Sequence, residues 1–171
     1  MTTTRVAVNG YGVIGKRVAD AVRAMPDMEL FGVADVASDW RIRTATGHDI
    51  PVFAATEEAE AAMRAAGVPV AGSLDDLLGQ IDAVVDTTPK MVAATNLDRY
   101  RTSGVKAVFQ GGESHATIGH SFVAQANYAT ALGRDATRVV SCNTTSIVRV
   151  LGALHDAALL ARARGDRKSV V

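Results

Sequence analysis

The stretch Arg5-Val-Ala-Val-Asn-Gly-Tyr-Gly-Val-Ile-Gly15 decides the fold of this chain of 171 residues. Its first five residues form a short strand-like run, and Gly10 to Gly15 match the pattern G-x-G-x-x-G. Residues 13 to 24 follow with one apolar face, and Pro26 ends the helix that this face predicts. A strand, a glycine turn and a helix in this order are typical of the first unit of a parallel α/β sheet.

The three glycines of this turn have different expected roles. Gly10 allows the tight turn, Gly12 lets the backbone approach a pyrophosphate, and Gly15 lets the helix pack closely on the strand. Phosphates would then lie at the helix N-terminus, where amide groups lack partners within the helix. Residues 10 to 15, Tyr11 included, are therefore a candidate cofactor-binding loop. The alternative is a glycine turn that only packs a helix.

The rest of the chain alternates apolar runs with segments of helical period, which predicts a Rossmann-type, doubly wound and mostly parallel α/β sheet. Residues 37 to 56 show no clear period and are expected to be a long connection that can contain one short helix. Residues 68 to 71 are expected to form a short edge strand, because they contain a proline. The predicted strands cover residues 5–9, 30–34, 81–85, 105–109 and 138–140, and the predicted helices 13–24, 57–66, 91–102 and a segment after residue 145.

Composition excludes several classes of protein. Lysine and arginine total 18, as do aspartate and glutamate, so no global charge favours nucleic acid or an anionic membrane. The polar start is not a secretory signal, and no apolar run approaches the roughly 18 residues of a membrane span. We therefore expect a cytoplasmic protein with neither nucleic acid nor membrane as a partner, and no metal site.

Asp35 lies 20 residues after Gly15, at the end of the second predicted strand. A carboxylate there can accept a hydrogen bond from a ribose 2′-OH and repel a 2′-phosphate, which favours NAD over NADP. Arg41 and Arg43 lie nearby and could offset the repulsion, and Asp39 could compete for the same role. The alternative is an exposed turn residue, since turns favour aspartate.

Cys142 is the only cysteine and cannot form an internal disulfide, so it is either an apolar filler or a chemical group. It lies between a predicted strand and a predicted helix, where unpaired amide groups favour a nucleophilic thiolate. The polar residues around it could hold a polar or phosphorylated substrate. These are Ser141, Asn143, Thr144 and Thr145.

Three motifs together resemble the archaeal-type phosphorylating glyceraldehyde-3-phosphate dehydrogenases, in the same order and spacing from about residue 4 to residue 164. They are Val8-Asn-Gly-Tyr-Gly-Val-Ile-Gly-Lys-Arg17, Phe109-Gln-Gly-Gly-Glu113 and Val139-Val-Ser-Cys-Asn-Thr-Thr145. The resemblance implies oxidation of glyceraldehyde 3-phosphate to 1,3-bisphosphoglycerate in glycolysis or gluconeogenesis. NAD or NADP and inorganic phosphate take part, and the full-length family is expected to form a tetramer.

The resemblance also implies roles for individual residues. Cys142 is the nucleophile whose thioester carries the reaction, and Ser141, Asn143 and Thr144 contact the substrate. Val13, Ile14 and Gly112 are expected to contact the cofactor. The loop of Thr87, Thr88 and Pro89 is expected to face the nicotinamide side.

Two departures from the family carry expectations of their own. Members often have lysine at the position of Asp35, which suits NADP. The base histidine of the family lies beyond residue 171, and His155 falls 13 positions after Cys142, on the order of 20 Å along one helix. His48, His115 and His120 lie in predicted loops and are expected to be surface or connecting residues.

We therefore expect residues 1–140 to be the NAD(P)-binding domain and residues 141–165 to begin a truncated catalytic domain. Residues 166–171 are expected to be a non-native tail, and this chain to be inactive alone. Two alternatives remain open. One is another thiol-dependent semialdehyde or acyl-phosphate dehydrogenase, and the other is a non-catalytic nucleotide-binding module.

Overall fold

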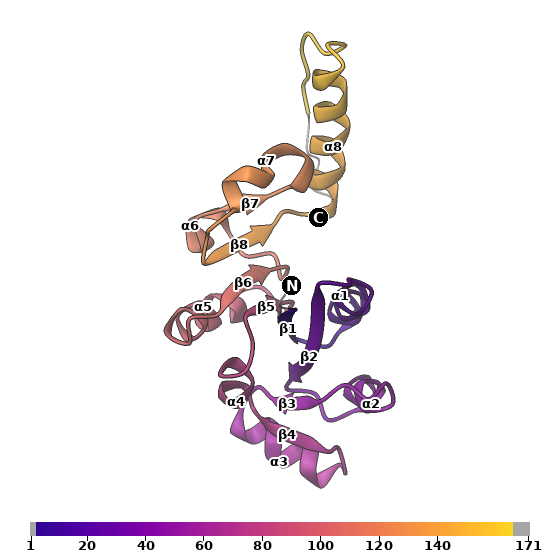
Figure 1. The fold of residues 1–171 in the computed structure, drawn as a ribbon, viewed down its shortest axis with the longest axis vertical. Coiled ribbons are helices and arrows are strands. Elements are labelled where there is room, and N and C mark those ends of the chain that lie inside the picture. The colour runs from indigo at the N-terminus through magenta and orange to yellow at the C-terminus, as the bar shows by residue number, and fades with distance from the viewer. Residues whose placement is uncertain (1–2, 166–171) are drawn as a thin grey trace, which may run out of the picture.

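The fold is an eight-stranded parallel sheet with helices packed on both faces, seen in a computed structural model that describes residues 3–165 (Figure 1). The strands are β1 (Thr4–Asn9), β2 (Met28–Asp35), β3 (Val52–Ala54), β4 (Val70–Ser73), β5 (Ala83–Asp86), β6 (Lys106–Phe109), β7 (Ser121–Phe122) and β8 (Ala136–Val139). The helices are α1 (Val13–Arg23), α2 (Trp40–Thr46), α3 (Glu57–Ala65), α4 (Leu74–Leu78), α5 (Val92–Thr102), α6 (His115–Ile118), α7 (Ala124–Ala131) and α8 (Cys142–Asp156). The predicted tail at residues 166–171 lies outside the described residues.

The strand order is β4-β3-β2-β1-β5-β6-β8-β7, and each paired strand runs parallel to its neighbour. The chain first builds the sheet outward from β1 to β4, then returns to the other side of β1 with β5. This reversal confirms the predicted doubly wound class. It also creates a switch point beside β1, where ligands bind in folds of this kind.

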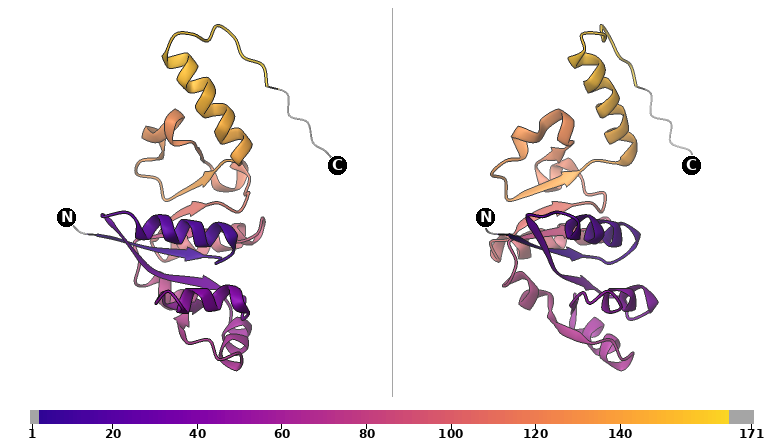
Figure 2. Two further views of the ribbon diagram at one scale, coloured as in Figure 1. Left: turned by 90° about the vertical axis from the view of Figure 1, so that its right-hand side faces the viewer. Right: turned by 45° about the vertical axis from the view of Figure 1, so that its right-hand side comes forward.

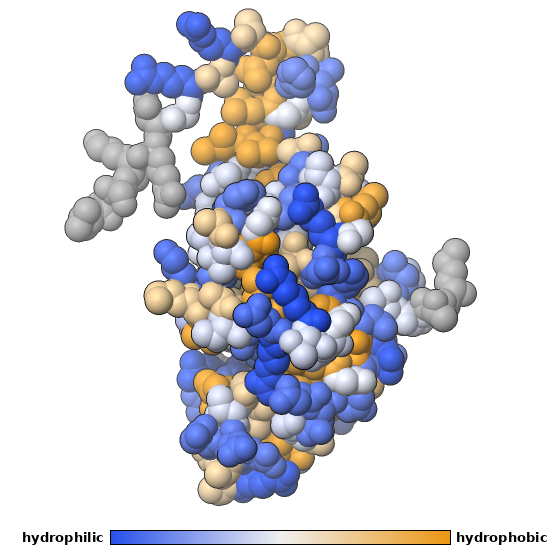
Figure 3. Space-filling view, turned by 90° about the vertical axis from the view of Figure 1, so that its left-hand side faces the viewer, coloured by the Kyte–Doolittle hydropathy of each residue, from blue (hydrophilic) through white to orange (hydrophobic). Residues whose placement is uncertain are grey.

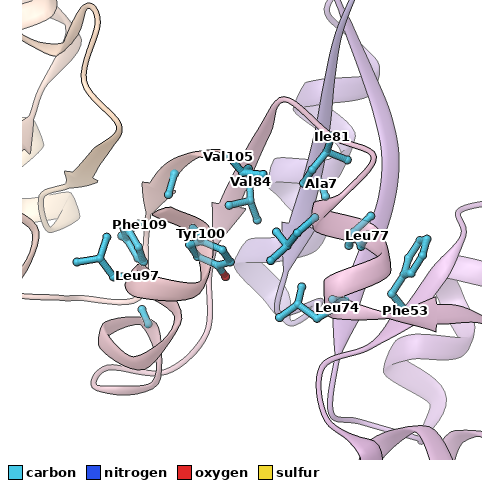
Figure 4. Close-up of a cluster of buried hydrophobic side chains, with 14 of the residues drawn as sticks. Ala7, Phe53, Leu74, Leu77, Ile81, Val84, Leu97, Tyr100, Val105 and Phe109 are labelled. Carbon is cyan, nitrogen blue, oxygen red and sulfur yellow. The ribbon is translucent and has the colours of Figure 1, made fainter. Parts of the chain in front are cut away.

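Two apolar cores lie on opposite faces of the sheet. One packs α4 and α5 against the strands and contains Leu77, Tyr100 and Phe109, as Figure 4 shows. The other packs α1, α2 and α3 and contains Val33 and Met63. Parallel sheets need this cover on both faces, because their central strands are apolar throughout.

The prediction of a long connection over residues 37–56 is wrong in part, because besides the short helix that it allowed, α2, this segment contains the strand β3. Asp39 caps α2 by accepting a hydrogen bond from the Arg41 amide, and Ile42 is fully buried beneath the helix. The three residues of β3 are all buried, so the strand has no alternation by which a sequence pattern could reveal it. The predicted edge strand is confirmed as β4, at residues 70–73 and at the edge of the sheet.

Helix α8 projects away from the sheet, as Figures 1 and 2 show. It follows β8, and its apolar side chains are exposed to 52% at Ile147, 58% at Val150 and 38% at Leu154. Figure 3 shows hydrophobic side chains gathered at the end of the molecule where α8 lies. Over residues 3–165, no helix has both the length and the apolar character needed to cross a membrane.

Candidate active site

The glycine turn has the geometry that its sequence pattern predicts. Gly10 adopts a φ of 93°, which side chains rarely allow, and a Cβ on Gly15 would collide with the carbonyl oxygen of Gly10. By contrast, a Cβ on Gly12 would meet no atom within 4 Å. Gly12 therefore leaves open space at the N-terminus of α1, where a phosphate could approach the backbone.

Asp35 closes the other side of this turn. Its carboxylate accepts hydrogen bonds from the backbone amides of Tyr11 at 2.5 Å, Val36 at 2.7 Å and Ala37 at 2.8 Å. The side chain thus links the end of β2 to the glycine loop, and it is more than an exposed turn residue. Tyr11 itself is buried, and Lys16 lies over its ring.

The arginines that could offset Asp35 have partners of their own. Arg41 makes a salt bridge of 2.7 Å to Asp39, and its hydrogen bonds hold the pKa of Asp39 below the usual range. Arg43 donates to the carbonyl of Ala66 at 2.6 Å. Asp39 therefore does not compete with Asp35, because it caps α2 and pairs with Arg41.

A crevice of about 710 Å³ lies at the switch point between β1 and β5. The residues that line it include Gly10, Gly12, Asp35, Thr87 and Thr88. Thr87 also donates a hydrogen bond to the carbonyl of Gly10 at 2.5 Å. The structure thus groups the predicted loop of Thr87 and Thr88 with the glycine turn and Asp35, rather than with Cys142.

A network of buried polar side chains includes several residues that line this crevice. Asp86 is fully buried and accepts hydrogen bonds from Thr88, from Asn96 and from the Tyr100 hydroxyl, the last at 2.6 Å. The Asn9 amide donates to the same hydroxyl at 2.7 Å. Burial and the neighbouring Asp86 charge raise the pKa of Tyr100, so the hydroxyl keeps its proton.

Asn9 keeps one free acceptor within this network. The residue is 1% exposed and lines the crevice, and its Oδ1 atom has no hydrogen-bond partner among the described residues. A buried acceptor without a partner is costly unless a donor reaches it. A ligand in the crevice could supply that donor.

The segment after β6 packs against the loop that precedes α5. Gly112 has a φ of 90°, and a Cβ on Gly111 would collide with the carbonyl oxygen of Thr88. Glu113 is buried and accepts a hydrogen bond of 2.6 Å from the amide of Met91, which precedes α5. Sequence reasoning selected Gly112 and missed the packing role of Gly111 and Glu113.

Cys142 is exposed and is the first residue of α8. Ser141 caps this helix by accepting a hydrogen bond from the Thr144 amide at 3.3 Å, and the Cys142 thiol points to Asn143 Oδ1 at 3.9 Å. The exposure rules out an apolar filler in this structure. It leaves the sulfur at the start of helix α8.

A second cavity, of about 850 Å³, is lined in part by Cys142. Ile14 from the glycine loop and Gln110 from the end of β6 line it on one side, and Ser141, Thr145 and further residues of α8 line it on the other. Of the predicted substrate residues, Ser141 lines this cavity, whereas Asn143 and Thr144 do not. The sequence analysis placed Gln110 in the motif Phe109–Glu113 but gave it no role, since only the fold brings it to the cysteine.

None of the histidines in the described residues lines the cysteine cavity. His155 lies near the far end of α8. The expectation for His120 holds only in part, because this connecting residue is buried, with its ring nitrogens 2.6 Å and 2.9 Å from the Thr137 and Thr130 hydroxyls. His115 begins α6 and contacts Ser121.

Comparisons with known proteins agree with the motifs. A family model described as "Dihydrodipicolinate reductase, N-terminus" matches residues 4–116. The chain is 49% identical over 151 residues to a glyceraldehyde-3-phosphate dehydrogenase of Methanothermobacter thermautotrophicus, over 88% of this chain and 45% of that protein. It is 51% identical over 152 residues to a glyceraldehyde-3-phosphate dehydrogenase of Thermococcus kodakarensis, over 89% of this chain and 46% of that protein. The predicted resemblance is thus confirmed.

The chain spans under half the length of these relatives. Among solved structures, aspartate semialdehyde dehydrogenase II of Vibrio cholerae superposes with a TM-score of 0.61 and 13% identity, over 91% of this chain and 47% of that one. At this identity the likeness concerns the fold alone. The family match ends at residue 116, so it covers the glycine turn and Asp35 but not Cys142.

Proposed function

We infer the function of this chain from its family, because over residues 4–116 it belongs to the family described as dihydrodipicolinate reductase, N-terminus. We propose that residues 1–140 form an NAD(P)-binding domain and that residues 141–165 begin a catalytic domain. The whole protein would be a phosphorylating glyceraldehyde-3-phosphate dehydrogenase, and its relatives named so support this proposal. We further propose a cytoplasmic tetramer for that whole protein.

The observation that carries the proposal is that Ile14 and Cys142 line the same cavity. Ile14 belongs to the glycine loop, so a cofactor held at this loop would lie next to the cavity that contains the sulfur. The residues present fit such a cofactor. Gly12 leaves room for the phosphates, Asp35 can accept from a ribose, and the buried Oδ1 of Asn9 lacks a donor.

The chemistry of this chain centres on Cys142. Its thiolate would attack the aldehyde carbon of glyceraldehyde 3-phosphate and form a thiohemiacetal. A bound NAD(P) would supply a hydride acceptor. Loss of the hydride from the former aldehyde carbon, and of the hydroxyl proton to a base, would convert the thiohemiacetal into a thioester. Inorganic phosphate would then attack the thioester carbonyl, which frees the thiolate and yields 1,3-bisphosphoglycerate. Ser141 lines the same cavity, and we propose that it holds the substrate beside the sulfur.

The cofactor proposal is tested by calorimetric titration with NAD and with NADP. Gly12→Ala should fold normally, because its φ is −77° and the added Cβ meets no atom, yet lose about tenfold or more in affinity as the backbone is held from the pyrophosphate. Gly79→Ala is the matched control, since its Cβ makes only ordinary contacts far from the crevice. Absence of binding by the folded chain to either dinucleotide would refute the proposal.

The thiol proposal is tested separately. Cys142→Ser should leave dinucleotide affinity within about twofold, because the sulfur lies in the second cavity. The chain as it stands should show no steady-state oxidation of glyceraldehyde 3-phosphate, since proton transfer needs a base near the nucleophile and no described histidine lines this cavity. Turnover that depends on Cys142 would contradict this expectation.

A further inference from the structure

We propose that Arg149 is the group that binds the phosphate of the reaction at the cysteine cavity. The proposal rests on the function proposed above and adds to it one binding residue and its ligand class. Arg149 lines the same cavity as Cys142, and among the described lining residues it is the only one with a formal charge at neutral pH. No carboxylate of the described lining offsets it.

The helical spacing places Arg149 on the cysteine side of α8. It lies seven residues after Cys142, which is close to two full turns and about 10 Å along the helix axis. Helical side chains lean toward the N-terminus, so the long arginine side chain is directed back along α8 toward the sulfur. A small anion between the two residues can therefore contact the guanidinium while its carbon chain meets the thiol.

Arg149 also has no competing partner in the described part of the chain. Other arginines are engaged, such as Arg99 with Asp75 and Arg138 with the carbonyl of Glu113. Within residues 3–165, no hydrogen bond or ion pair of Arg149 is present. Guanidinium groups bind phosphate oxygens through two parallel N–H donors, so an unpaired arginine suits a phosphate group.

The hydroxyl groups around Arg149 extend the same site. Thr145 and Ser146 lie three and four residues after Cys142, on the face of α8 that lines the cavity, and Ser141 lies at its start. Hydroxyls can donate to the oxygens of an anion. The cavity thus combines one cation and the hydroxyls of Ser141 and Ser146 beside a nucleophile, while the Thr145 hydroxyl donates to the Val140 carbonyl. This set fits a short aldehyde that carries a phosphate ester, or the phosphate that attacks the thioester.

The lone cysteine permits a direct test in the chain as it exists. Cys142 is alkylated with iodoacetate, an anion, and with iodoacetamide, its neutral analogue, at constant ionic strength. Arg149→Gln should slow the iodoacetate reaction by about fivefold, as for an exposed charge pair, and change the iodoacetamide rate by less than twofold. Arg149→Lys should retain most of the iodoacetate rate. Arg23→Gln, an equal change in charge at the far end of α1, should alter neither rate.

Protection identifies the source of the phosphate. Inorganic phosphate and glycerol 3-phosphate are added separately during alkylation. Protection by the ester alone assigns Arg149 to the substrate phosphate, protection by inorganic phosphate alone assigns it to the attacking phosphate, and protection by both assigns it to either in turn. Each of these supports the proposal when Arg149→Gln abolishes the protection.

Equal iodoacetate rates in the original chain and Arg149→Gln, or protection that survives this substitution, would overturn the proposal. The outcome is separable from that of the proposed function. A chain that binds dinucleotide but shows no effect of Arg149 refutes only this inference. A chain with the Arg149 effect but no dinucleotide binding refutes only the cofactor proposal.

Discussion

Asp35 stabilises the glycine loop and is also proposed to bind the ribose of the cofactor beside it. Its carboxylate accepts three backbone amides, from Tyr11, Val36 and Ala37, and it lines the crevice as well. A single side chain thus fixes the end of β2 against the glycine turn. Changes at this position should therefore affect both stability and the choice of cofactor.

We expect Asp35→Lys to shift the ratio of NAD to NADP affinity toward NADP by about tenfold or more, because it removes a carboxylate that repels the 2′-phosphate. The same substitution should lower the free energy of unfolding by about 1–3 kcal/mol, since three amides lose a charged acceptor. Titration with both dinucleotides and urea unfolding measure the two effects. Asp27→Lys, an equal charge change at an exposed site, should change neither. An unchanged ratio would contradict the proposed role of Asp35.

The roles of single residues were predictable where the backbone conformation requires a particular residue type. The roles of Gly10, Gly12 and Gly15 follow from their pattern, because a tight turn and a close helix need residues without side chains. Arg149 carried no such signal, and Gln110 lies in a recognised motif that gave it no role of its own. Their position depends on the packing of α8 and β6 around one cavity, which joins residues far apart in the chain.

Helix α5 contacts the sheet through the hydrogen bonds of one tyrosine as well as through apolar packing. The Tyr100 hydroxyl, which is fully buried, donates to Asp86 of β5 and accepts from Asn9 of β1. It therefore joins the two strands that flank the switch point. This contact spans 91 residues of sequence at its longest, so no local pattern indicates it.

Tyr100→Phe should lower the free energy of unfolding by about 1–3 kcal/mol, because the Asn9 amide and the Asp86 carboxylate each lose a buried partner. Urea unfolding followed by circular dichroism measures the change. Tyr128→Phe removes a hydroxyl from a residue that is 61% exposed and should change the value by no more than about 0.5 kcal/mol. Equal effects of the two substitutions would show that the buried network adds no stability.

His120 should make the segment of α6, β7 and α7 sensitive to acid. Burial lowers the pKa of His120 below its usual value of about 6.5. The unfolded chain then binds a proton more readily than the folded chain. The contribution of His120 to stability is therefore full above about pH 6.5 and is lost as the pH falls through the folded pKa.

Unfolding free energies measured between pH 7.5 and pH 5 test this expectation. The decrease toward pH 5 should be smaller in His120→Gln than in the original chain, and unaltered in His48→Gln, because His48 is exposed. The lowered pKa values of Asp75 and Asp135, caused mainly by hydrogen bonds from Arg99 and Lys106, affect stability only at lower pH. An identical decrease in all three chains would exclude His120 as its source.

Elements were predictable where they are long enough to show a period. Helices α1 and α5 and strands β1, β2 and β6 match their predicted ranges within two residues. Helix α2 was expected only as a short helix without bounds, and strand β3 was missed, because a helix of 7 residues and a strand of 3 residues are held by tertiary burial rather than by a repeated pattern. The same reason applies to α6, β7 and α7.

At the scale of the whole molecule, the exposed apolar face of α8 should control association. Ile147 and Val150 are more than half exposed, and the chain spans under half the length of its relatives. We expect concentration-dependent oligomers in size-exclusion chromatography with light scattering, because apolar patches of this kind drive association.

The variant Ile147→Lys/Val150→Glu should shift these oligomers toward the monomer and leave the net charge unchanged. The control Arg17→Glu/Glu29→Lys exchanges charges at exposed sites away from α8 and should leave the oligomers as they are. A monomeric original chain at all concentrations would contradict the expectation.

The strand order also sets a sequence of events during synthesis on the ribosome. Strands β1 to β4 form one half of the sheet and are complete at Ser73, while the other edge of β1 stays open until β5 arrives at Ala83. From then on, β5, β6 and β8 each find a preformed edge on which to pair as they emerge, and β7 waits for β8. The half that carries Asp35 can thus assemble before the half that carries Cys142 has left the ribosomal tunnel.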